Sequence, residues 1–87
     1  MSKQQILSVR VTQDDINKGK PGNEYFCPIA LALRKQGHER VSVVDGYATL
    51  GRNKDMYILP HKAREFVNDF DDCFIVKPFS FSACILE

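Results

Sequence analysis

The stretch YFCPIALALRKQG, from Tyr25 to Gly37, decides how the chain is organised. Pro28 suits the first helical position, where its missing N–H would have no partner, and Gly37 is well placed just after the last turn. The side chains between them begin with a run that is apolar on every side, which is typical of a helix enclosed by the fold. The stretch therefore predicts a buried helix over about residues 28–36.

A strand and a short helix are predicted before this buried helix. ILSVRV, Ile6 to Val11, alternates apolar and polar residues with the period of a half-buried strand. TQDD, Thr12 to Asp15, has the form of a capping box, and glycine and proline within residues 19–22 limit the helix that it begins to little more than one turn. A loop over residues 18–24 then leads to the buried helix.

A β-hairpin is predicted after the buried helix. Asp45-Gly46 is a strong two-residue turn signal, and β-branched residues flank it. Counting outward from the turn pairs Val44 with Tyr47 and Val43 with Ala48. The segment thus predicts two antiparallel strands in a defined register.

One more strand, an amphipathic helix and a final strand complete the chain. MYIL, Met56 to Leu59, predicts the third strand of a meander. Within LPHKAREFVNDFDD, apolar residues at i, i+3, i+4 and i+7 predict a helix, and its stripe consists of Ala63, Phe66, Val67 and Phe70. VKPFSFSACIL alternates as a strand, with one side formed by Phe79, Phe81, Ala83 and Ile85.

This order of elements predicts an α+β fold. We expect a mixed, mainly antiparallel sheet of about five strands, with two main helices and one short helix on one face. Residues 1–87 are expected to form a single domain, because a chain of this length buries only enough apolar surface on folding to form one core.

Composition and charge exclude several classes of function. The formal net charge is +1, so we expect neither sequence-specific nucleic-acid binding nor attraction to an anionic membrane. The three cysteines lack C-x-x-C spacing, which argues against a disulfide framework and a zinc site. No apolar run has the length of a signal peptide core or a membrane span. We therefore expect a cytoplasmic protein without a metal or another cofactor.

Cys27 is the candidate for covalent chemistry. A thiol at a helix N-terminus can have its pKa lowered by the helix dipole and then act as a nucleophile. Phe26 and Ile29 surround it with apolar surface, which would raise its pKa instead, and no motif ties it to His38 or His61. We therefore interpret Cys27 as a core residue and expect no enzyme.

The polar segment before the buried helix is a candidate ligand site. Cations, glycines and free N–H groups at a helix start form a generic site for an anion such as a nucleotide phosphate. No Walker or G-x-G-x-x-G pattern accompanies it, so a plain loop is the alternative. The candidate ligand residues are Lys18, Lys20, Asn23, Tyr25 and Cys27.

A cluster of carboxylates ends the second main helix. Asp69, Asp71 and Asp72 are unfavourable at the carbonyl end of a helix, which suggests a reason for their presence. A calcium loop would need alternating ligands around a glycine, which is absent here. We interpret the cluster as a candidate contact surface for a basic partner, with a solvated helix end as the alternative.

Four motifs occur in a fixed order: VRVTQDDINKG, CPIALALRKQG, LPHKAREFVNDFD and PFSF. With them the chain, over about Val9 to Phe81, resembles a family of short proteins of bacteriophage and prophage genomes. The family has no assigned activity, so no residue role follows from the resemblance. What it implies is a phage context. Small folded phage proteins without catalytic motifs frequently bind and disable a host protein, including proteins of host immune systems.

Three hypotheses for function follow. The first is a phage accessory protein that, in the host cytosol, binds and inhibits a host defence protein without catalysis. The second is a protein that sequesters a nucleotide signal at the helix mouth over Lys18 to Cys27, and the third is a Cys27-dependent enzyme. A homodimer through the edge of the final strand or of the hairpin is also plausible, because exposed sheet edges pair readily.

Overall fold

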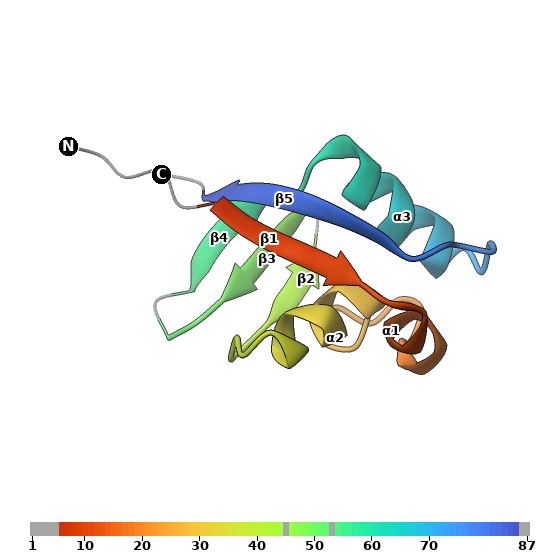
Figure 1. Cartoon of the computed structure of the whole chain (residues 1–87), viewed down its shortest axis with the longest axis horizontal. Helices are drawn as coiled ribbons and strands as arrows, with labels where there is room; N and C mark the ends of the chain where they lie inside the picture. Colours follow the sequence, from red (N-terminus) through yellow and green to blue (C-terminus); the bar gives the residue numbers. More distant parts are fainter. Residues whose placement is uncertain (1–5, 45, 53, 86–87) are drawn as a thin grey trace.

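The structure is a computed structural model that describes residues 6–44, 46–52 and 54–85. It contains, in order, β1 (Ile6–Val11), α1 (Gln13–Lys18), α2 (Pro28–Lys35), β2 (Ser42–Val44), β3 (Tyr47–Leu50), β4 (Asp55–Ile58), α3 (His61–Asp71) and β5 (Phe79–Ile85) (Figure 1). The strands form one sheet in the order β1-β5-β4-β3-β2, and every pairing among the described strands is antiparallel. The predicted α+β class is confirmed.

The two N-terminal helices begin as the sequence predicts. The carboxylate of Asp15 accepts a hydrogen bond from the Thr12 N–H at 2.9 Å, and the Thr12 hydroxyl accepts one from the Asp15 N–H at 3.3 Å. Asp15 is also 1% exposed and forms an ion pair with Lys35 at 3.1 Å. This pair joins α1 to α2, a contact that local capping rules do not predict.

The hairpin has the predicted register. Val44 is opposite Tyr47 and Val43 is opposite Ala48. Gly46 has a φ of 81°, the left-handed conformation that such a turn requires, while Asp45 lies outside the described residues. The chain then turns again into β4, which begins one residue earlier than predicted.

One core lies between the sheet and the helices. The inward residues of the strands alternate with exposed ones, and both α2 and α3 contribute their apolar sides to the same cluster. In α3, the ring of Phe66 packs against Phe79 with 4.7 Å between centroids. Figure 1 shows α3 alongside β5 and the pair α1 and α2 near the end of β1. Val67, the fourth residue of the predicted stripe, is only half-buried because it lines a groove.

The edges of the sheet correct one expectation. The final strand was expected to offer a sheet edge, and this is wrong for its C-terminal end, where β5 lies between β1 and β4 and pairs with β4 through Cys84 and Ile85. At the β1 edge, the Gln36 side-chain amide donates to the Ser8 carbonyl at 2.7 Å and accepts from the Arg10 N–H at 3.1 Å. At the β2 edge, the Val43 N–H donates to the Glu24 carbonyl at 2.8 Å. Both edges are therefore partly occupied by the chain itself, which limits pairing with another sheet.

Candidate functional site

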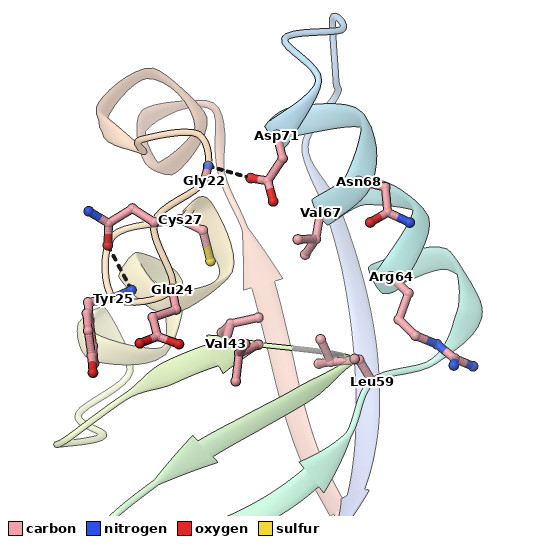
Figure 2. Close-up of a pocket in the computed structure, with 13 residues that line it drawn as sticks. Gly22, Glu24, Tyr25, Cys27, Val43, Leu59, Arg64, Val67, Asn68 and Asp71 are labelled. Carbon is pink, nitrogen blue, oxygen red and sulfur yellow. Dashed lines mark hydrogen bonds between the residues drawn. The ribbon is translucent and has the colours of Figure 1, made fainter.

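A groove with a volume of about 730 Å³ opens between the loop before α2 and helix α3 (Figure 2). Apolar side chains of Val43, Leu59 and Val67 line it together with polar groups from both walls. Its size is within the range of pockets that hold small ligands or a few residues of a peptide. The full lining consists of Gly22, Asn23, Glu24, Tyr25, Cys27, Val43, Val44, Gly46, Leu59, Arg64, Val67, Asn68 and Asp71.

Two hydrogen-bonded features hold the loop wall in place. The side-chain oxygen of Asn23 accepts from the Tyr25 N–H at 2.9 Å and from the Phe26 N–H at 3.1 Å, which fixes the turn into α2. The Asp71 carboxylate accepts from the Gly22 N–H at 2.8 Å and so ties the end of α3 to this loop. Figure 2 shows Asp71 and Val67 directed from α3 toward the loop.

The charges around the groove are mainly negative. Among its described lining residues, Glu24 and Asp71 are acidic and Arg64 is basic. The Glu24 carboxylate raises the pKa of the Tyr25 hydroxyl, chiefly by accepting its hydrogen bond and also through its charge. The Arg64 side chain runs close to Gly46, where an added Cβ would lie 2.9 Å from its Cδ, and in Figure 2 it points away from the loop.

Cys27 is the N-cap of α2 and a buried residue. Its sulfur accepts a hydrogen bond from the Ala30 N–H at 3.5 Å, and the residue is 3% exposed. Burial raises the pKa of the Cys27 thiol, and this effect exceeds the opposing influence of the backbone N–H groups at the helix start. The thiol is therefore neutral near pH 7 and poorly suited to act as a nucleophile.

The predicted ligand residues are only partly brought together. Asn23, Tyr25 and Cys27 line the groove. Lys18 instead pairs with Asp14 at 3.3 Å on the exposed side of α1, and the Lys20 ammonium lies 5.8 Å from the centre of the Phe26 ring. The cations expected to receive a phosphate thus lie outside the groove.

The predicted acidic cluster also separates. Asp71 lines the groove, whereas Asp69 and Asp72 lie outside it and are exposed. In the described residues, no group of three or more histidine, cysteine, aspartate or glutamate side chains is arranged to hold a metal ion. None of the described helices has the length and apolar character needed to cross a membrane.

The outer face of the sheet carries a row of apolar side chains that the sequence did not predict. Strand register places Ile6 opposite Cys84, Cys84 opposite Ile58, Ile58 opposite Tyr47, and Tyr47 opposite Val44. These five residues, called here the outer row, therefore cross all five strands in a line. Ile6 is 60% exposed, Val44 44% and Ile58 41%.

The strand residues around the outer row are almost uncharged, and Lys62 of α3 lines a shallow hollow beside them. The other described strand residues on this face are Ser8, Arg10, Ser42, Thr49, Met56, Ser80 and Ser82. Arg10 is the one charged residue among them. A signal in the sequence did exist, since Val44, Tyr47 and Ile58 are apolar at positions that alternate with core residues, but strand order was needed to align them.

A second exposed apolar feature lies in the loop after α3. Phe74 is 63% exposed and Ile75 is 97% exposed. The preceding Cys73 has a φ of 64°, which is uncommon for a residue with a side chain. The loop lies beyond the end of α3, at one extremity of the molecule (Figure 1).

Comparisons with known proteins find no relative of this chain. No protein-family model, curated protein or solved structure matches the chain. The resemblance to short phage proteins accordingly stays a prediction from the sequence motifs.

Proposed function

We propose that the protein is a non-enzymatic accessory protein of phage type, which binds a host defence protein and inhibits it by direct contact through the outer row. The outer row is the observation that supports this function. Large exposed apolar surface is uncommon on soluble monomers, and the centres of protein interfaces are depleted in charge. A row of apolar side chains across five strands, with Arg10 as the one charge among the described strand residues of that face, fits such a centre.

The partner of this face is a protein with an apolar, weakly charged surface. The side chains of the outer row include no cation to pair with a phosphate, which proteins bind mainly through cations and N–H groups. An apolar surface instead gains free energy when it and a matching apolar surface are removed from water. The resemblance to phage proteins supplies the host defence component as the class of partner.

Nucleotide sequestration is the second candidate function. The presence of Asn23, Tyr25 and Cys27 in a groove of suitable volume favours it. The Glu24 and Asp71 carboxylates oppose it, because they would repel a phosphate. Lys18 and Lys20 do not line the groove and contact Asp14 and the Phe26 ring instead.

Charge insertion into the outer row tests the proposed function. The chain and its Ile58→Lys variant are expressed with an affinity tag in a bacterium that carries active defence systems, and co-purifying proteins and defence activity are measured. We expect the parent to retain one host protein and to suppress defence, and Ile58→Lys to lose both while melting within a few degrees of the parent. Ile75→Lys is the matched control, because it makes the same change at a 97% exposed position off this face.

Two outcomes would contradict this assignment. Retention of the partner by Ile58→Lys, with loss in Ile75→Lys, would move the contact to the loop after α3. Stabilisation of the parent by a nucleotide, abolished when Lys18 and Lys20 are changed to Glu, would favour the second candidate. A ligand at a hundredfold excess over its Kd would add about 2.7 kcal/mol of stability, which a melting experiment readily detects.

A further inference from the structure

We propose that the groove between the loop before α2 and helix α3 is a separate binding site for an extended protein segment that carries lysine or arginine beside an apolar residue. This site lies on the helical side of the sheet and does not depend on the outer row. The proposal goes beyond inhibition by the sheet face, because it predicts a second contact of different chemistry.

The charges of the groove select a cation. Glu24 comes from the loop wall and Asp71 from the α3 wall, so a basic side chain between them is attracted from both sides. One oxygen of Asp71 accepts from the Gly22 N–H, which positions the carboxylate without neutralising it. Described α3 has no basic residue in its last turn, so the partial negative charge of its carbonyl end adds to the same potential.

The apolar part of the lining favours an apolar residue next to the lysine or arginine of the bound segment. Val43 and Leu59 supply a buried base, and Val67 remains half-buried although it belongs to the core-facing stripe of α3. An apolar side chain, or the methylene stem of lysine or arginine, would cover Val67 while the charged end stays near the carboxylates.

Arg64 does not reverse this preference. Its stem lies against Gly46, at the hairpin side of the lining, and Figure 2 shows its guanidinium directed away from the loop that carries Glu24. An anionic segment would therefore meet two carboxylates on the facing walls before it reached a cation. A basic segment meets complementary charge at both.

Selection from a random library of linear heptapeptides, displayed and panned on the immobilised full chain, provides the test. Selected peptides are made with a fluorescent label, and their affinity is measured by anisotropy. We expect them to contain lysine or arginine next to an apolar residue and to bind more weakly as salt is raised, because the attraction is between charges. Amide shifts on binding should map to residues 22–27 and to α3.

Matched variants make the result specific to the groove. Glu24→Gln with Asp71→Asn removes both charges and keeps an oxygen to accept the Gly22 N–H, and we expect at least a tenfold loss of affinity. Glu65→Gln, also on α3 but paired with the exposed His61, is the control and should bind as the parent does. Should Asp71→Asn lower the melting temperature, Glu24→Gln alone carries the comparison.

Several results would overturn the proposal. These are selection of acidic peptides, failure to select any peptide, and equal affinity for the parent and the double variant. Concentration-dependent dimerisation that the double variant abolishes would assign the groove to a second copy instead. Normal peptide binding by Ile58→Lys is expected, and it keeps this test separate from that of the outer row.

Discussion

The two faces of the sheet use similar residues for different purposes. Val43 and Val44 are neighbours in β2, yet the first is 5% exposed and the second 44% exposed. Cys27, at the start of α2 on the helix side of the sheet, is buried, while Cys84 in the outer row is exposed. The same side chains thus stabilise the fold on one face and remain available for a partner on the other. Residue type alone does not distinguish the two roles, because the alternation of a strand and the placement of the helices decide which face is covered.

The largest effect is expected on the inner face. Phe66→Ala should reduce the free energy of unfolding by about 3–5 kcal/mol, because it removes a buried ring and leaves a cavity beside Phe79. Chemical denaturation followed by circular dichroism measures this loss. Phe74→Ala, at a 63% exposed position, is the control and should change stability by less than about 0.5 kcal/mol. Equal stability of the two variants would mean that the apolar stripe of α3 does not stabilise the core.

A smaller effect is expected at Cys27, and it should depend on pH. Cys27→Ser should cost about 1–2 kcal/mol, because the hydroxyl can still cap the Ala30 N–H but is poorly suited to apolar surroundings. Burial raises the thiol pKa above its ordinary value of 9.0, so the unfolded chain loses this proton first as pH rises. The parent should therefore lose stability as pH rises past about 9, and Cys27→Ser should lack this part of the decline.

Iodoacetamide compares the buried cysteine with the two exposed cysteines directly. In the native protein near neutral pH, the exposed Cys73 and Cys84 should be labelled well before Cys27, with peptide mass spectrometry as the readout. Rapid labelling of native Cys27, together with an inactive but folded Cys27→Ser variant, would favour the hypothesis of a Cys27-dependent enzyme.

The smallest effect is expected on the outer face. Val44→Ala should change the free energy of unfolding by less than about 0.5 kcal/mol, whereas Val43→Ala should cost about 1–3 kcal/mol through lost burial. Thermal and urea denaturation of the two variants give this comparison with a single residue type. A large loss for Val44→Ala would show that the outer face is covered within the folded chain, and the outer row would no longer be a binding surface.

The candidate groove was partly predictable from the sequence. Asn23, Tyr25 and Cys27 were recognised because they directly precede a helix, and Asp71 because it ends one. The hydrogen bond from the Gly22 N–H to the Asp71 carboxylate brings this loop and the end of α3 together across 49 positions of sequence, and it was not predictable. Lys18 and Lys20 were expected to face a ligand, but short-range partners, Asp14 and the Phe26 ring, occupy them instead.

The sequence by itself determined the local elements. Hydrophobic period, the Thr12 capping box, Pro28 at a helix start and the Asp45-Gly46 turn signal act over a few residues, so they predicted most of the helices and strands and the hairpin register. They also assigned an inward and an outward side to β1 and β5. These features depend on neighbouring residues, and neighbours are known from sequence.

Only the tertiary structure decided the strand order, and with it both candidate binding surfaces. The final strand pairs between β1 and β4, which aligns Cys84 with Ile6 on one side and with Ile58 on the other. The same packing places the end of α3 against the loop before α2 and opens the groove. Such contacts join residues far apart in sequence, and their choice depends on how the whole apolar surface is buried at once, so no local pattern specifies them.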